Sequence, residues 1–422
     1  MLTSDHDHRW HWFQRCWAIA VLSLLAATWR LWLPVAEFPQ VPLFTMPVAG
    51  PRFSAAVSIG LALSLLCIVL GGSYHARVHW LLLVCLGLAF VLNQHRLQPW
   101  AYQAALHCLA LAALPPSSAR RWIAAITVSI YVYSAWGKFD YQFLHTVGQQ
   151  FVTLALGPAE GAPSRGRLAL AACLPLTELV IATGLCVLPL RRAAGIAAMT
   201  MHAGLLFILG PWMLGHSTGV LLWNAWLIPL SWFLFVAAKA DVQHHPVRSL
   251  SGWPARLVLL TALLAPLLER AGLWDHWLSW SLYSPHTSRV EVELHQSNLE
   301  SMPTSAAPFV IADTDEDQWH QIALDRWSLE ALGVPLYPQA RFQLGVAESL
   351  AERLPLQDGI RVKVKSASHR WNGSRSERWL RGSREINAAT RDYWFLGRPR
   401  LDDRKFWLPA PRFERKSKDQ EH

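Results

Sequence analysis

Long apolar runs separated by short polar breaks occupy the first two-thirds of the chain. A helix that spans a membrane needs about 20 mostly apolar residues. About nine stretches approach this pattern: residues 16–33, 53–71, 78–93, 100–114, 122–136, 168–190, 193–211, 219–238 and 257–268. The fourth and ninth are short and could be partial or tilted spans. We therefore expect an all-α, polytopic transmembrane bundle of about nine helices over residues 1–272.

The pattern changes after residue 272. Residues 289–295 alternate apolar and charged side chains, which predicts a half-buried strand. Two further stretches are strand candidates, residues 308–312 and 359–366. Apolar side chains in residues 337–354 have helical spacing, and Pro338 is suited to the first turn of a helix. Residues 379–382 end another short element. These elements predict a small extramembrane α+β domain over residues 273–400, followed by a polar, basic tail over residues 401–422.

Composition supports a membrane protein. The chain is 52% hydrophobic and 16% charged, whereas a soluble domain carries about 25% charged residues. Several of the 23 tryptophans lie at the edges of apolar runs, where amphipathic rings settle at a membrane interface. The net charge of +9 is spread over short loops and the tail. Because no aromatic–basic interleaving accompanies it, we expect the lipid bilayer as a partner and no nucleic acid.

The six cysteines lie in or beside the predicted spans and form no CxxC pair. This spacing disfavours a disulfide framework, a dithiol relay and a zinc site. We expect the cysteines to be buried small hydrophobic side chains, and we expect no metal site.

Basic residues in the short loops indicate orientation. If the N-terminus is cytoplasmic, most loop arginines and lysines fall on the cytoplasmic side, as the positive-inside rule requires. With nine spans, the α+β domain is then external. The expected location is the cell (inner) membrane.

Lys138 and Asp140 follow the fifth apolar run, where hydrocarbon gives way to water. Charged side chains at that depth are costly unless they are paired, hydrated or functional. Burial disfavours the charged amine, so Lys138 is a candidate general base in a cavity near the outer leaflet. The alternative is a lysine that extends to the headgroups beside Asp140.

Two polar residues interrupt later apolar runs. Glu178 needs a partner there, and Lys138 and His202 are the plausible ones. Alternatively, Glu178 is a protonated, hydrogen-bonded structural residue, and His202 ties two helices together.

Four more residues lie at or near the outer ends of predicted spans and are candidates to contact a cofactor: His95, Arg96, Trp136 and His145. Single histidines at an interface are more often structural than functional.

Several of these features together resemble the horizontally transferred transmembrane (HTTM) domain family, which includes the vitamin K-dependent gamma-carboxylase. The matching features are the Asn93-Gln94 break before Trp100 and Tyr102, the Lys138-Phe139-Asp140 turn, Glu178, an arginine break and His202. They fall in a core of about residues 78–238. The carboxylase has two consecutive lysines where this chain has Gly137-Lys138, and it has a much longer soluble part.

The resemblance implies a role for this turn. In the carboxylase, the lysine of the turn deprotonates vitamin K hydroquinone. Carried over to this chain, it implies that Lys138 is the base, that Asp140, Glu178 and His202 tune or relay protons, and that the cofactor or substrate is a quinol of that kind.

The helical bundle is also similar to the DoxX and MauE redox-associated membrane proteins. This second resemblance implies a non-catalytic role, as a partner or assembly factor for a membrane or secreted protein. The sequence leaves the enzyme and the partner role open.

Overall fold

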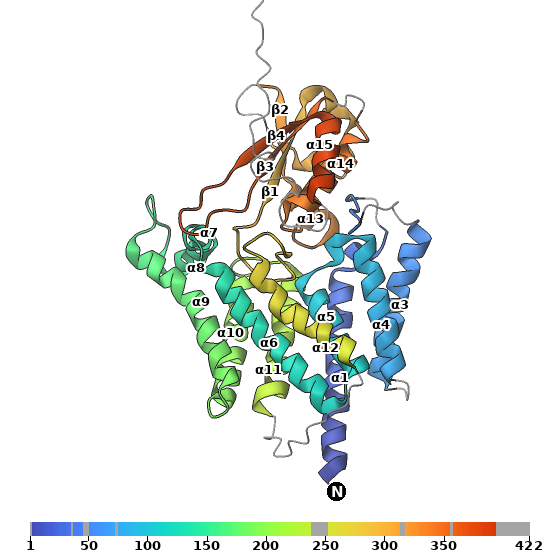
Figure 1. The fold of residues 1–422 in the computed structure, drawn as a ribbon. Coiled ribbons are helices and arrows are strands. Elements are labelled where there is room, and N and C mark those ends of the chain that lie inside the picture. Colours follow the sequence, from blue (N-terminus) through green and yellow to red (C-terminus); the bar gives the residue numbers. More distant parts are fainter. Residues whose placement is uncertain are drawn as a thin grey trace, which may run out of the picture.

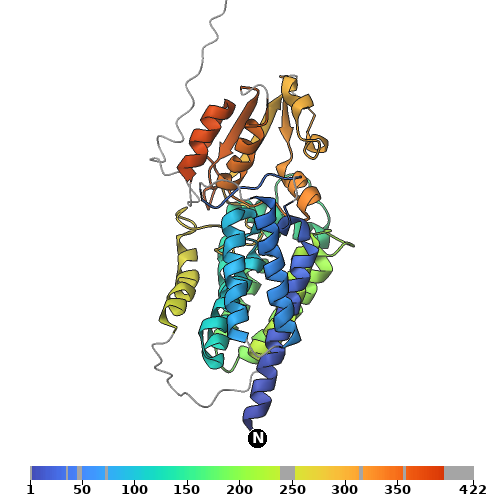
Figure 2. The same ribbon diagram turned by 90° about the vertical axis from the view of Figure 1, so that its right-hand side faces the viewer.

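The computed structural model describes residues 2–34, 37–44, 50–71, 75–237, 252–312, 317–354 and 358–393. The predicted tail, residues 401–422, lies outside the described residues. Most of the first 270 residues form a bundle of long helices, and a four-stranded sheet lies beyond one end of it (Figure 1). Figure 2 shows that the first helix begins at the opposite end of the bundle.

The bundle contains twelve of the fifteen α-helices in the described residues. They are α1 (Leu2–Ala27), α2 (Trp29–Trp32), α3 (Pro51–Leu70), α4 (His75–Leu92), α5 (Pro99–Ala113), α6 (Pro116–Lys138), α7 (Tyr141–His145), α8 (Val147–Leu156), α9 (Arg165–Cys186), α10 (Arg191–Leu209), α11 (Thr218–Ser231) and α12 (Trp253–Leu264). Short helical turns extend three of the ends: η1 (Gln94–Arg96), η2 (Trp232–Val236) and η3 (Ala265–Leu268).

Proline begins several of these helices. Pro51, Pro99 and Pro116 each occupy the first turn of their helix, where the missing N–H has no intrahelical partner to lose. α3 ends at Gly71, whose left-handed backbone, with φ of 80°, suits a residue without a side chain. The short polar breaks in the sequence therefore coincide with chain turns.

Each of the nine predicted apolar stretches overlaps a helix. Among the described residues, four helices are long and apolar enough to cross a membrane: Pro51–Leu70, Arg165–Cys186, Arg191–Leu209 and Thr218–Val236. Two shorter apolar helices are Ala76–Leu92 and Trp253–Leu268. The coarse prediction of apolar spanning helices is therefore supported, and the count of nine spans stays a prediction.

The second part of the molecule, which we call the sheet domain, begins with β1 (Arg289–His295). Its other elements are η4 (Gln296–Ser301), η5 (Ala307–Phe309), β2 (Trp319–Ile322), α13 (Leu324–Leu332), α14 (Ala340–Ala351), β3 (Ile360–Lys365), β4 (Glu377–Arg381) and α15 (Gly382–Tyr393). The strands form one antiparallel sheet in the order β2-β1-β3-β4.

Alternation of side chains gives the sheet two different faces. Val292 of β1 pairs with Val362 of β3, and both are fully buried against the face that carries α14 and α15. The intervening residues face away, and Arg361 there forms an ion pair with Glu293. One face is therefore core, and the other is a surface of paired charges.

The predictions for this part are mostly confirmed. The strand at residues 289–295 is β1, the strand at 359–366 contains β3, and the predicted helix at 337–354 contains α14. The strand at 308–312 is wrong, because residues 307–309 form a 3₁₀ turn and only Val310 bridges to Ile322. Pro308 has no N–H to give to a ladder, which explains the failure. β2, α13 and α15 were not predicted.

Residues 273–288, which we call the junction segment, join the bundle to the sheet domain. Asp275 accepts hydrogen bonds at 2.7 Å from the Tyr337 hydroxyl and at 2.6 Å from Arg341 Nη2. All three side chains are buried. Burial, together with the negative charge of Asp275, raises the pKa of Tyr337 well above its ordinary value. The tyrosine therefore stays a neutral donor.

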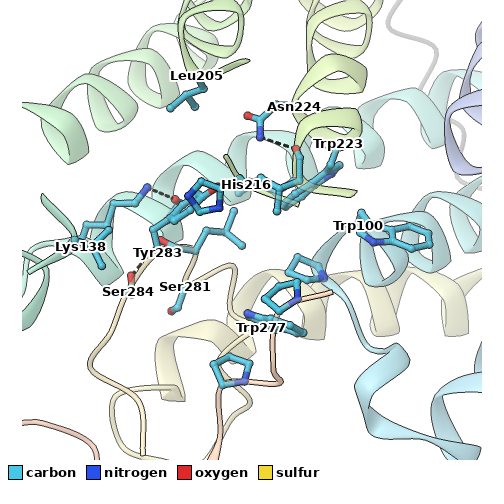
Figure 3. A pocket seen from close by; sticks show the side chains of 18 of the residues that line it. Trp100, Lys138, Leu205, His216, Trp223, Asn224, Trp277, Ser281, Tyr283 and Ser284 are labelled. Carbon is cyan, nitrogen blue, oxygen red and sulfur yellow. Dashed lines mark hydrogen bonds between the residues drawn. The ribbon is translucent and has the colours of Figure 1, made fainter. Parts of the chain in front are cut away.

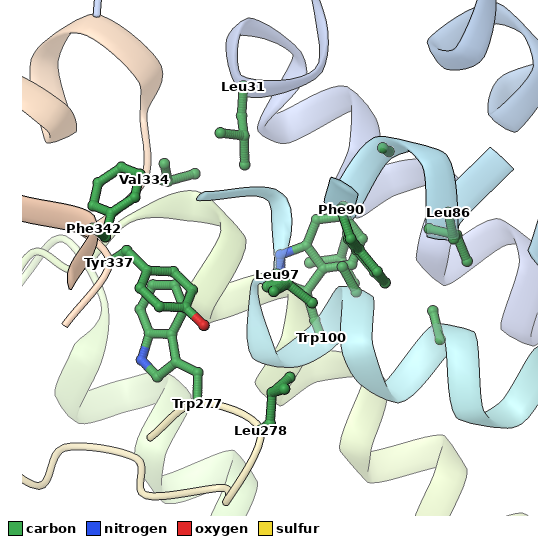
Figure 4. Close-up of a cluster of buried hydrophobic side chains, with 14 of the residues drawn as sticks. Leu31, Leu86, Phe90, Leu97, Trp100, Trp277, Leu278, Val334, Tyr337 and Phe342 are labelled. Atoms are coloured by element: carbon green, nitrogen blue, oxygen red, sulfur yellow. The ribbon is translucent and has the colours of Figure 1, made fainter. Parts of the chain in front are cut away.

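Hydrophobic side chains from both parts pack around this polar centre. Trp277 stacks edge-on against Tyr337, with ring centroids 4.8 Å apart. Figure 4 shows these rings in one cluster with Phe342 of α14 and Trp100 of α5. The bundle and the sheet domain therefore share a core.

Arg341→Met tests the importance of this centre. The variant leaves the Asp275 carboxylate buried without its cation, which costs about 3–5 kcal/mol when a buried pair loses one partner. We expect a clear fall in the unfolding temperature of the detergent-solubilised protein. Arg326→Met, on the exposed face of α13, is the matched control and should unfold like the wild type. Equal unfolding temperatures for the two variants would contradict this account.

Candidate functional site

A cavity of about 480 Å³ lies where the helical bundle meets the junction segment. Its walls come from α5, α6, α8, α9, α10 and α11, and residues 334–338 of the sheet domain close one side. Large apolar side chains form much of the wall, among them Trp100, Phe151, Leu205, Trp223 and Trp277. Figure 3 shows Lys138 at one side of the cavity and Leu205, Trp223, Trp277 and Trp100 at its other sides.

Lys138 is the last residue of α6 and lines this cavity. Its Nζ donates to Ser134 Oγ at 2.7 Å and lies 2.5 Å from Glu178 Oε1 of α9. The two charged side chains are only 7% and 13% exposed. The predicted pairing of Glu178 with Lys138 is thus confirmed.

Glu178 uses only one oxygen in this pair. Its other oxygen, Oε2, is buried and has no hydrogen-bond partner among the described residues. A buried oxygen without a donor is costly. A ligand hydroxyl that entered the cavity could satisfy it.

His202 forms a second polar group in the same cavity. Its Nδ1 lies 3.0 Å from Asn224 Oδ1, and its Nε2 lies 2.9 Å from the Tyr131 hydroxyl. Asn224 donates through Nδ2 to Val220 O, so its oxygen is the atom that faces the histidine. His202 therefore carries its proton on Nδ1 and accepts from Tyr131 at Nε2. This ties α6, α10 and α11 together, as the structural alternative for His202 requires, and it also fixes the ring at the cavity wall.

Asp140 does not pair with Lys138. Its Oδ1 accepts from the Gln142 N–H at 2.8 Å and caps α7, and its Oδ2 lies 2.9 Å from Arg270 Nη1. Arg270 also donates to Gly137 O at 3.1 Å. Asp140 therefore holds the turn that positions Lys138 and does not reach the cavity.

Gly137 has a packing role in that turn. A Cβ at this position would lie 2.6 Å from Ser284 Oγ of the junction segment. Only glycine allows the junction segment to approach the end of α6 so closely. Ser281, Tyr283 and Ser284 consequently line the cavity beside Lys138.

The four residues predicted to contact a cofactor are elsewhere; none is among the residues that line the cavity. His95 Nε2 bonds to Pro335 O, and Arg96 bonds to Leu31 O and Trp32 O, so both fasten loops. Trp136 is half exposed beneath Arg370, and His145 stacks on Tyr141. A role for these four in cofactor binding stays a prediction without geometric support.

The sequence interpretation missed the junction segment as part of the cavity. Tyr283 places its ring 6.0 Å from Lys138 Nζ and edge-on against His216. Burial, with the nearby charge of Glu178, raises the pKa of Tyr283, and burial lowers the pKa of His216. Both side chains therefore stay neutral. The sequence feature that could have indicated this segment is the run of aromatic residues, serines and histidines that follows the last apolar stretch.

The chain matches no protein-family model, no curated protein and no solved structure. The chemistry of the cavity is thus the basis for assigning a function. The cavity offers an apolar volume, one buried acid–base pair and a histidine held by two hydrogen bonds. This arrangement can hold a largely apolar molecule and exchange a proton with one polar group on it.

Glu178→Gln tests the electrostatics of the cavity. The amide leaves the Lys138 ammonium buried without a carboxylate, and we expect a loss of about 3–5 kcal/mol in the free energy of unfolding. The double variant Lys138→Met with Glu178→Leu should be markedly more stable than Glu178→Gln, because apolar replacement of both partners removes the desolvation cost. Denaturant unfolding in detergent micelles measures both. A double variant less stable than the single one would contradict the buried pair.

Proposed function

We propose that this chain is an integral membrane protein that binds a lipophilic, quinol-like molecule and takes a proton from it with the Lys138–Glu178 pair. The observation that carries this proposal is the placement of one buried acid–base pair in the wall of a largely apolar cavity. Ligand cavities commonly measure about 300–1,000 Å³ and place few polar groups among apolar side chains. A quinol has this composition, with ring hydroxyls on an apolar body.

Exposed apolar side chains on the helices support the membrane location. Ile59 of α3, Val180 of α9 and Phe207 of α10 are each more than half exposed, at 57%, 63% and 60%. Single exposed apolar residues are common on soluble proteins, but here they occur on helices long and apolar enough to span a bilayer. Lipid would cover them.

The proton can move by either of two routes, and the net transfer from the ligand to the pair is the same in both. In one, the Glu178 carboxylate accepts the proton of a ring hydroxyl, and the Lys138 ammonium stabilises the oxygen anion. In the other, the proton shared by the pair lies on Glu178, and the neutral Lys138 amine accepts the hydroxyl proton. In both, an O–H bond breaks, the electron pair stays on the ring oxygen and the pair gains one proton.

The proposed relationship to the HTTM domain family agrees with this chemistry. The resemblance implies a lysine base at the end of α6, an acidic residue in the following long helix and a histidine in the next. Lys138, Glu178 and His202 all line one cavity. Deprotonation of a quinol such as vitamin K hydroquinone is the reaction that this relationship implies.

A quinone-binding measurement tests the proposal. Trp100, Trp223 and Trp277 line the cavity, so a quinone bound there should quench tryptophan fluorescence. We expect saturable quenching by a short-chain menaquinone in the wild type. In the Lys138→Met, Glu178→Leu double variant, we expect affinity for the reduced quinol to fall about tenfold or more, equivalent to about 1.4 kcal/mol.

Lys363→Met, on the open face of the sheet, is the control for that experiment and should bind like the wild type. Identical affinities in all three proteins would contradict a role for the pair. Such a result would favour the non-catalytic anchor that similarity to the DoxX and MauE proteins implies.

We also propose that the N-terminus is cytoplasmic and the sheet domain external. Trp371 in the sheet domain is 74% exposed, and the turn between α9 and α10 lies at the far end of the bundle (Figure 1). In a cysteine-free background, Trp371→Cys should react with a membrane-impermeant maleimide in intact cells or spheroplasts. Arg192→Cys, in the first turn of α10 next to that turn, should react only after lysis. The reverse labelling pattern would overturn the orientation.

A further inference from the structure

We propose that Glu269, His276 and His286 form a binding site for one divalent transition-metal ion of the Zn²⁺ type. The site lies where the last helical turn of the bundle, η3, meets the junction segment. It is separate from the Lys138–Glu178 pair and does not depend on the proposed quinol chemistry.

Three metal-binding side chains converge at this point. Glu269 Oε1 lies 2.9 Å from His276 Nδ1 and 2.8 Å from His286 Nε2. One potential ligand atom from each residue lies within 4.8 Å of the others. The imidazole side chains are each 2% exposed and that of Glu269 is 8% exposed. All three are therefore packed in place around a common centre.

The donor set identifies the class of ion. Two imidazole nitrogens and one carboxylate oxygen are typical of open zinc and non-haem iron sites, whereas Ca²⁺ and Mg²⁺ prefer oxygen ligands. With bonds of about 2.1 Å, donors around a tetrahedral ion are about 3.4 Å apart. The two glutamate–histidine separations, 2.9 Å and 2.8 Å, are shorter than this by about 0.5 Å. Small side-chain rotations would therefore admit an ion.

The surroundings hold the two histidines firmly. The Ser281 N–H donates to His276 O at 3.2 Å, and the Ser368 N–H of the sheet domain donates to His286 O at 2.7 Å. Arg270 Nε lies 3.9 Å from Glu269 Oε2, so the guanidinium approaches the oxygen that the histidines do not use. These contacts limit how far the two imidazoles and the carboxylate can move.

The position of the site suggests its consequence. His276 also lines the cavity, and His286 is bonded through its backbone to the sheet domain. An ion held here would fasten the bundle, the junction segment and the sheet domain together next to the cavity. Binding to the folded state alone would stabilise the protein, and the stabilisation would grow with the logarithm of the ion concentration above the dissociation constant. Without an ion, the three side chains form a hydrogen-bonded tie, and that is the competing explanation.

The test uses the full-length protein in detergent micelles, stripped with a chelator and titrated with Co²⁺ and Zn²⁺. Co²⁺ reports nitrogen and oxygen coordination through its visible absorption bands, and elemental analysis after desalting gives the number of Zn²⁺ ions retained. We expect one tightly held ion per chain at this site, the appearance of visible Co²⁺ bands, and a Zn²⁺-dependent rise in the unfolding temperature.

Variants separate this site from other histidines, including those near the N-terminus. His276→Ala and His286→Ala should each lose one equivalent of Zn²⁺, the Co²⁺ bands and the thermal shift. His295→Ala, at the end of β1, should retain all three. If the stripped wild type takes up no ion, or if the first two variants retain as much as the wild type, the cluster is only a hydrogen-bonded tie and the proposal is overturned. A Zn²⁺ response with no quinone binding would leave this site intact and reject only the proposed function.

Discussion

The buried ion pair between Lys138 and Glu178 is the constraint on which the rest of the site depends. Two charges in a largely apolar interior are tolerated only when they face each other closely. This requires the end of α6 and the middle of α9 to pack together, with their interface set by a 2.5 Å contact. The cavity lies beside that pair, so the groups that keep α6 and α9 in register also give the cavity its polar centre.

A second layer of contacts fixes the turn after Lys138. Asp140 holds Arg270, and Arg270 returns to the backbone of Gly137, so the turn is tied to the end of the last bundle helix. Glu269 lies beside Arg270 and is buried, and burial by itself raises the pKa of its carboxyl group. The neighbouring His286 and His276 outweigh burial and hold that pKa well below its ordinary value, so Glu269 is ionised. The carboxylate therefore accepts hydrogen bonds from both histidines. The sheet domain reaches the same region through residues 334–338 and closes the cavity.

Sequence reasoning predicted those features that depend on local pattern. Apolar runs located the helices, and alternation located β1 and β3. Because an unpaired charge in an apolar run is improbable, the sequence also predicted that Glu178 pairs with Lys138. It could not predict that Asp140 turns away from Lys138, because the competing partner, Arg270, is 130 residues away. Nor could it bring Glu269, His276 and His286 together, because their spacing follows no familiar ligand pattern and the junction segment is irregular. Long-range contacts and irregular backbone account for these omissions.

A structure of the protein in lipid nanodiscs with a reduced menaquinone added would test the central claim most directly. The account predicts density for a quinol ring in the cavity, with a ring oxygen within hydrogen-bond distance of Lys138 Nζ or Glu178 Oε2. Density for a lipid chain alone in the cavity at saturating quinol, or a quinol bound elsewhere on the protein, would contradict it.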